Sequence, residues 1–284
     1  MNQSLIEATR GELCWEPELI VPDVEGRPAI GFQAVVRSDS RRVLGIVSDR
    51  YQTAPNRVLR QCVEEFSQMG FTKGSLGETM NGARTYAYLE APLTSEVPWV
   101  LNDIVRHGVI ISNRHDGAGS WSYKMYSERL VCLNGMTQRG EGHHLSFRHT
   151  ASLTSQLIGI APRILEMLQA GVSQVEAKMV CMVNTNPSRE QIEHVLNTLW
   201  PDPAGEARRN AAQHHREHVR SLMESPNNSL PGMERTGWAL YNSITEHVDH
   251  RSTTRSAEAR LESAVYGHDA NIKAKAEELV LALR

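Results

Sequence analysis

The sequence lacks the short motifs that mark nucleotide-dependent and hydrolytic enzymes. Neither GxxxxGKS/T nor GxGxxG occurs, and these are the glycine-rich loops that cradle the phosphates of ATP and dinucleotides. GxSxG and HExxH, which mark serine hydrolases and zinc proteases, are also missing. The sequence therefore assigns no catalytic residue and predicts no nucleotide or other cofactor.

Cysteine and long apolar runs are scarce as well. The four cysteines are widely spaced and form no CxxC pair, which excludes a thioredoxin-like motif and a zinc ribbon. No run of about 18 apolar residues occurs, so we expect no membrane span and no membrane partner. The first residues lack the basic region and apolar core of a secretory signal, so we expect a cytoplasmic protein with reduced thiols.

Charge is nearly balanced over the whole chain but not within it. The formal net charge is −3, which neither favours nor excludes nucleic acid. From Val105 to Thr150, however, six Lys and Arg residues, including Arg139, stand against three acids, and aromatic residues lie among them. A basic, aromatic, strand-like stretch is typical of a surface that holds a polyanion.

The order of periodicities predicts an α+β fold with the sheet first. Strand-like alternation in Gly31–Arg37 and Val43–Val47 precedes a helical pattern that begins near Pro55, and further strands follow. We expect an N-terminal antiparallel sheet with one packed helix over residues 1–150. A helical C-terminal half should occupy residues 151–284.

Three positions predict where the helices of the second half begin or bend. Thr150 is the expected N-cap of a long helix, and Pro162 is expected to kink that helix. A second helix is expected to begin at Asn186-Pro187.

Alternation also divides the aromatic residues between two faces of one strand. Trp121 and Tyr123 lie opposite Lys124 and Tyr126. We expect the first pair in the core and the second pair at a ligand, because sheet proteins grip single strands by stacking bases and neutralising phosphates. The residues predicted to contact nucleic acid are Arg114, His115, Lys124, Tyr126, Arg129 and Arg148.

The loop Asn113-Arg114-His115-Asp116-Gly117 has three open interpretations. Asn, Asp and Gly suit a plain turn between strands. Arg114 and His115 also suit a phosphate contact. A site of Asn113, His115 and Asp116 would suit acid–base chemistry in a metal-dependent nuclease or hydrolase, although no nucleophile accompanies it.

Histidine is plentiful, and His214 and His218 are spaced to share one helix face. The intervening Arg216-Glu217 does not reproduce HExxH. A solvated helix face is therefore the preferred interpretation, and no metal ligand is assigned.

Several strings resemble a family of phage- and plasmid-encoded proteins known as domain of unknown function 932. They are SNRHDGAGS, RLVCLNGM, the FRHT that precedes a long helix, GWALYNSITEHVDH and VSDRYQTAPNRVLRQCVEEF. The resemblance extends from about Ile30 to Leu283. Gly135-Met136 departs from it, because a Thr-Leu pair is common in the family at that place.

The resemblance implies an association with mobile elements and hence with DNA metabolism. The order of strands and helix is also similar, at the level of fold alone, to phage single-strand annealing proteins of the Erf and Red-beta type. That similarity implies a homo-oligomer that holds single-stranded DNA by its backbone without a cofactor. The hypothesis is therefore single-strand DNA binding or annealing in recombination, and a non-catalytic protein that binds a host protein in anti-defence remains the other alternative.

Overall fold

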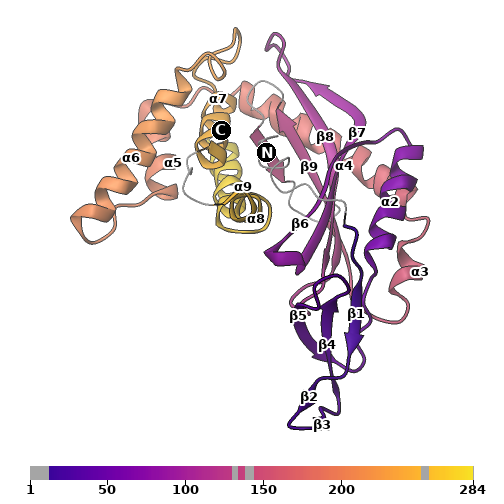
Figure 1. Ribbon diagram of the computed structural model, residues 1–284. Helices are drawn as coiled ribbons and strands as arrows, with labels where there is room; N and C mark the ends of the chain where they lie inside the picture. The colour runs from indigo at the N-terminus through magenta and orange to yellow at the C-terminus, as the bar shows by residue number, and fades with distance from the viewer. Residues whose placement is uncertain (1–12, 130–133, 138–143, 251–255, 284) are drawn as a thin grey trace.

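The computed structural model describes residues 13–129, 134–137, 144–250 and 256–283 of the 284-residue chain. Antiparallel sheets form the N-terminal part and helices form the C-terminal half, which confirms the predicted α+β class (Figure 1). Arg139 of the basic stretch lies outside the described residues.

The strands form a six-stranded, a three-stranded and a two-stranded sheet. The large sheet has the order β10-β9-β8-β7-β6, with β11 also paired to β9, and the smaller sheets have the orders β1-β4-β5 and β2-β3. The strands are β1 (Pro17–Ile20), β2 (Asp23–Val24), β3 (Arg27–Pro28), β4 (Phe32–Arg37), β5 (Val43–Ser48), β6 (Thr72–Thr79), β7 (Arg84–Glu96), β8 (Ile104–Arg114), β9 (Trp121–Arg129), β10 (Asn134–Thr137) and β11 (His144–Phe147).

The helices follow the large sheet, apart from α2 and the short 3-10 turn η1 (Met80–Gly82). They are α2 (Asn56–Gln68), α3 (Leu153–Leu157), α4 (Ala161–Val183), α5 (Arg189–Leu199), α6 (Glu206–Met223), α7 (Gly237–His250), α8 (Ala257–Tyr266) and α9 (His268–Leu281). No helix in the described ranges is long and apolar enough to cross a bilayer.

One face of the large sheet packs against α2, α3 and α4. Leu59 and Phe66 of α2 meet Trp121 and Tyr123 of β9 in a single apolar cluster, and all four side chains are buried. The predicted core position of Trp121 and Tyr123 is therefore confirmed. Their burial removes apolar area from water at about 25 cal/mol per Å², the main favourable contribution to folding.

The opposite face of the sheet is covered as well. Tyr88 and Tyr126 pack against Leu261 and Val265 of α8. The two tyrosine rings are stacked with centroids 4.1 Å apart. The sheet is therefore a buried middle layer with helices on both faces, and its basic, aromatic face is not open to solvent.

A buried ion pair joins the sheet to the helical half. Arg129 at the end of β9 donates Nε–H to Asp103 Oδ1 at 2.5 Å, and neither side chain is exposed. Trp238 of α7 donates its indole N–H to the other oxygen of Asp103 at 2.9 Å, and a further guanidinium N–H reaches Asn228 Oδ1 at 3.0 Å. Each charge thus meets an opposite charge or a hydrogen-bond partner, as burial requires.

Two predicted helix features are wrong. The long helix is two helices, because α3 ends at Leu157 and α4 begins at Ala161. Pro162 lies in the first turn of α4, where its missing N–H costs no hydrogen bond, instead of kinking a continuous helix. The N-cap of α3 is Ser152 and not Thr150.

The ion pair leads to a test of stability. Replacing Asp103 by Ala leaves the Arg129 guanidinium buried without its counter-charge, so we expect the free energy of unfolding to fall by about 3–5 kcal/mol. Asp103→Leu combined with Arg129→Met should recover part of this loss, because no charge then stays buried alone. Urea unfolding followed by circular dichroism measures both effects. Glu278→Ala, which removes an exposed pair with Lys275, is the control, and an equal loss in it would contradict the assignment.

Candidate nucleic-acid interface

Two residues that the sequence pattern assigned to a ligand-facing surface lie in the interior. Arg129 has an exposed fraction of 0 % and is held by Asp103. Tyr126 has an exposed fraction of 1 %, and its hydroxyl donates to the Leu89 carbonyl oxygen at 3.2 Å. The expectation that both face outward is wrong, because α8 covers Tyr126 on one face of β9, and Asn228 and Met233 meet Arg129 on the other.

Lys124 and Arg114 reach the surface in part, but both already have partners. Lys124 donates to the Val265 carbonyl oxygen at 2.7 Å, and its ammonium lies 4.9 Å from the centre of the Tyr266 ring. Arg114 donates Nε–H to Asp116 Oδ1 at 3.0 Å and makes a second bond to the other oxygen of that carboxylate. A phosphate would have to displace these contacts to reach either cation.

His115 is buried in a polar network that joins the sheet to α2. Its Nε2 lies 3.1 Å from Asn56 Oδ1, so the imidazole N–H donates to that amide oxygen. The ring meets Trp15 edge-on at a centroid distance of 5.4 Å, and burial lowers the pKa of His115 to about 3. Neither His115 nor Asn113 is exposed, so the expectation that His115 reaches a ligand is wrong.

The turn after β8 packs on β5 at positions where only glycine fits. A Cβ added to Gly45 would lie 2.4 Å from the Asp116 carbonyl oxygen, and one added to Gly117 would lie 2.8 Å from Val47 Cγ1. The Tyr51 hydroxyl also donates to the Arg114 carbonyl oxygen at 3.0 Å. These contacts fix the turn of the large sheet against the three-stranded sheet.

An open pocket of about 550 Å³ lies beside this contact. Three segments that are far apart in the sequence border it: residues 48–51 at the end of β5, the turn 117–120, and residues 146–150 after and within β11. We call it the Arg50–Arg148 pocket, after the two exposed arginines that line it. Neither arginine forms an ion pair with any residue that the structure describes, in contrast to Arg114 and Arg129.

Hydroxyl groups and a glycine-containing turn complete the wall of the pocket. Ser48, Ser120, Ser146 and Thr150 line it together with Gly117–Gly119. Guanidinium and hydroxyl groups are the donors that phosphate oxygens accept most readily. Of the six residues predicted to contact nucleic acid, Arg148 is the one that the structure leaves exposed and without an ionic partner among the described residues.

An exposed aromatic ring lies on the strand next to Ser48, one of the residues that line the pocket. Phe32 on β4 pairs with Ser48 on β5, so both side chains are on one face of the three-stranded sheet. The Phe32 side chain is 56 % exposed, and Ile46 on the same face is also exposed. Phe32 and Arg50 were missed from the sequence, where Phe32 reads as one more apolar strand residue.

A family model described as a domain of unknown function, DUF932, matches residues 43–265. The chain belongs to this family. No curated protein and no solved structure matches the chain. In this DUF932 domain, three of the strings that carry the resemblance meet at the Arg50–Arg148 pocket, in the segments around Tyr51, Asp116 and His149.

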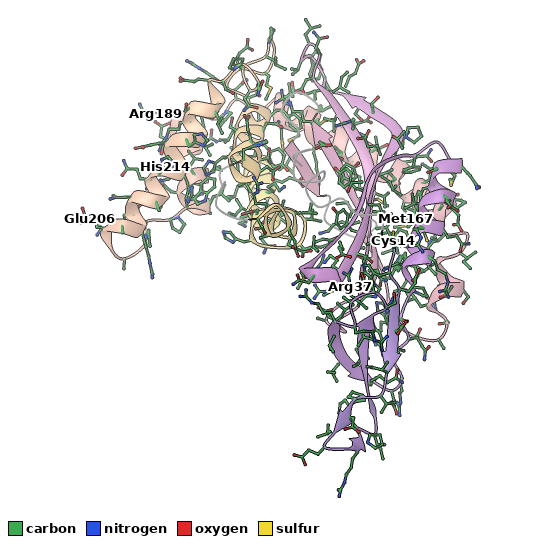
Figure 2. All side chains as sticks on the ribbon, in the orientation of Figure 1. Cys14, Arg37, Met167, Arg189, Glu206 and His214 are labelled. Carbon is green, nitrogen blue, oxygen red and sulfur yellow. The ribbon has the colours of Figure 1, made fainter. Side chains whose placement is uncertain are left out.

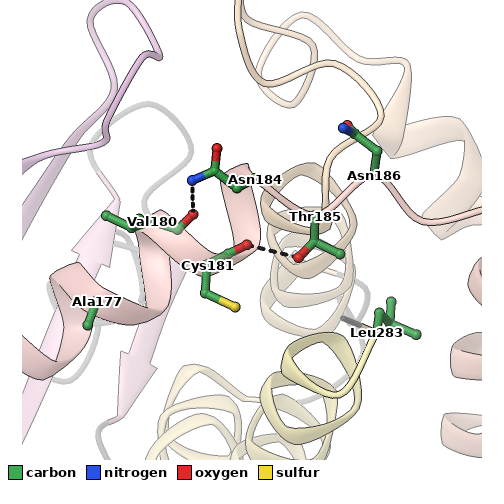
Figure 3. A pocket seen from close by; sticks show the side chains of 7 residues that line it. All are labelled: Ala177, Val180, Cys181, Asn184, Thr185, Asn186 and Leu283. Atoms are coloured by element: carbon green, nitrogen blue, oxygen red, sulfur yellow. Dashed lines mark hydrogen bonds between the residues drawn. The ribbon is translucent and has the colours of Figure 1, made fainter.

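Two other features of this DUF932 protein do not offer the same chemistry. A second hollow of about 530 Å³ lies between the end of α4 and Leu283, and none of the described residues that line it is charged (Figure 3). Asn184 and Thr185 in its wall donate back to carbonyl oxygens of α4. His214 and His218 lie exposed on α6, and no three His, Cys, Asp or Glu side chains in the described ranges are grouped to hold a metal ion.

The buried His115 predicts how stability depends on pH. Its pKa in the folded protein, about 3, is below the ordinary value of 6.5, so between these values the unfolded chain is protonated and the folded chain is not. Stability should therefore fall as the pH falls through this window, by several kcal/mol in total. His115→Gln should lower the slope of unfolding free energy against pH, measured by urea unfolding. His194 is exposed, so His194→Gln should keep the wild-type slope. Equal slopes in all three proteins would contradict the assignment of this pH dependence to His115.

Proposed function

We propose that this protein binds single-stranded DNA and acts in annealing or recombination as a phage- or plasmid-associated factor without a nucleotide cofactor. The observation that carries the proposal is the Arg50–Arg148 pocket, with the exposed Phe32 on the strand that neighbours β5. The substrate class is the one that the sequence suggested, but the contact surface moves from β9 to the junction of the two larger sheets.

The pocket and the ring supply the two parts of single-strand recognition. Two arginines without ionic partners among the described residues attract backbone phosphates, and the hydroxyl groups around them donate to phosphate oxygens. An exposed aromatic ring stacks on a base, which is accessible only when it is not stacked inside a duplex. Together they favour a single strand over a double helix.

The alternative of a metal-dependent nuclease has less support. It needs Asn113, His115 and Asp116 to face a substrate, yet the first two are buried and Asp116 is paired with Arg114. Their contacts with Asn56 and with the turn after β8 give them a structural role instead.

The proposal includes a homo-oligomer, the form in which annealing proteins act. Trp99 and Leu101, between β7 and β8, are each 68 % exposed and supply an apolar surface away from the pocket for contacts between subunits.

The two arginines give the first test of binding. Arg50→Ala combined with Arg148→Ala should weaken binding of a fluorescein-labelled oligothymidylate about tenfold or more. The slope of log affinity against log salt should fall by about 0.7 for each phosphate contact removed. Arg189→Ala is the matched control, because Arg189 is exposed on α5, far from the pocket (Figure 2). Wild-type affinity in the double variant would overturn the proposed function.

Phe32 gives an independent test that does not involve charge. Phe32→Ala should weaken binding of the same oligonucleotide by about 1–3 kcal/mol, or about 5-fold to 150-fold, while the salt slope stays at the wild-type value. Phe32→Tyr should retain most of the affinity, because the ring remains. Ile158→Ala, between α3 and α4, removes a comparably exposed apolar side chain and should bind normally. A changed salt slope in Phe32→Ala would argue against stacking.

A further inference from the structure

One ring nitrogen in the wall of the Arg50–Arg148 pocket has no hydrogen-bond partner among the residues that the structure describes. His149 lines the pocket and has an exposed fraction of 8 %. Its Nδ1 lies 3.1 Å from the Gln52 carbonyl oxygen, which can only accept, so the neutral ring carries its proton on Nδ1. The buried Nε2 is then a lone-pair acceptor without a donor.

The ring is held so that Nε2 cannot turn to another partner. Its face stacks on Tyr51 with centroids 4.7 Å apart and an angle of 17° between the planes. The Gln52 backbone N–H also donates to the His149 carbonyl oxygen at 3.2 Å. A buried polar atom that the fold orients but does not satisfy is a place where a ligand supplies the missing partner.

The charges around the ring decide its protonation in the empty pocket. Burial lowers the pKa of His149, and the hydrogen bond to Gln52 and the Asp116 carboxylate oppose this effect only in part. Arg50 and Arg148 line the same pocket and disfavour a third positive charge, while Asp49 is exposed beside Arg50. His115 stays neutral because it is buried. Without a ligand, His149 is therefore neutral near pH 7.

A phosphate group reverses this balance. Its oxygens are acceptors, so they are repelled by the lone pair of a neutral Nε2 and attracted by a protonated one. Its negative charge also offsets the two arginines, which favours a cationic imidazole. Binding of phosphate and uptake of a proton from solvent by Nε2 therefore favour each other.

We propose that His149 is the proton-linked contact of a phosphate subsite: a phosphate ester bound between Arg50 and Arg148 is held also by Nε2–H of a protonated His149. The inference rests on the proposed function, since the phosphate is that of a nucleic-acid backbone. It adds that affinity for nucleic acid rises as the pH falls, because the bound state holds about one more proton than the free state.

The test measures oligothymidylate binding by the wild-type protein and by His149→Gln between about pH 8 and about pH 5.5. Wild-type affinity should rise by up to about tenfold for each unit of pH across the titration. His149→Gln should lose most of this rise. His144→Gln, an exposed histidine in the same segment, should keep it.

Two further measurements keep the inference testable if His149→Gln folds poorly. Calorimetric titration of the wild-type protein in two buffers with different ionisation enthalpies should detect proton uptake on binding. Proton NMR should find the pKa of His149 raised by at least about one unit with oligothymidylate bound. Inorganic phosphate in place of the oligonucleotide distinguishes a free anion from the backbone, and tighter binding of inorganic phosphate than of the oligonucleotide would overturn the assignment.

Failure of this inference is distinguishable from failure of the proposed function. If the double arginine variant loses affinity but wild type and His149→Gln share one pH dependence, His149 is not the proton-linked contact and the function stands. If the double arginine variant binds oligothymidylate normally, the proposed function fails and the subsite fails with it.

Discussion

The buried pair of Arg129 and Asp103 is the interaction on which the rest of this structure depends. Two opposite charges sealed from water are stable only while each keeps the other and its hydrogen-bond partners. Those partners come from α7 and from the segment before it, so the helical half has to stay packed against the end of β9. Helix α8 closes the other face of the large sheet over Tyr88 and Tyr126, and the Arg50–Arg148 pocket stays open at the junction with the three-stranded sheet.

Periodicity predicted the elements well but not what covers them. The alternation in Gly31–Arg37 and the helical spacing after Pro55 correspond to β4 and α2, and Trp121 and Tyr123 are core residues as expected. Alternation states that a strand has two faces, yet it does not state which distant helix lies on each. Tyr126 and Arg129 were therefore assigned to solvent. The opposite error occurred at Phe32, whose exposure was not predicted. Only the tertiary structure shows that this apolar strand residue is left uncovered.

The strings that carry the family resemblance supply both a packed contact and the exposed arginines of the pocket. His115 and Asn56 are buried and Gly45 lies against the turn after β8, so a substitution at these positions meets backbone or leaves a polar atom unsatisfied. The side chains of Arg50, Arg148 and Phe32 are exposed. They take no part in this packed contact. The strings that carry the resemblance thus contain the packed residues His115 and Asn56 as well as the exposed Arg50 and Arg148, whereas Phe32 lies outside them.

The two arginines of the pocket belong to different sheets. Arg50 follows β5 of the three-stranded sheet, whereas Arg148 follows β11 of the large sheet. A phosphate held by both arginines would connect the two sheets. By thermodynamic linkage, the bound phosphate would stabilise the contact between the sheets by the same free energy with which that contact favours phosphate binding. Each bound nucleotide would then make the contact between the two sheets more rigid. The protein bound along a strand would therefore be more rigid than the same protein free in solution.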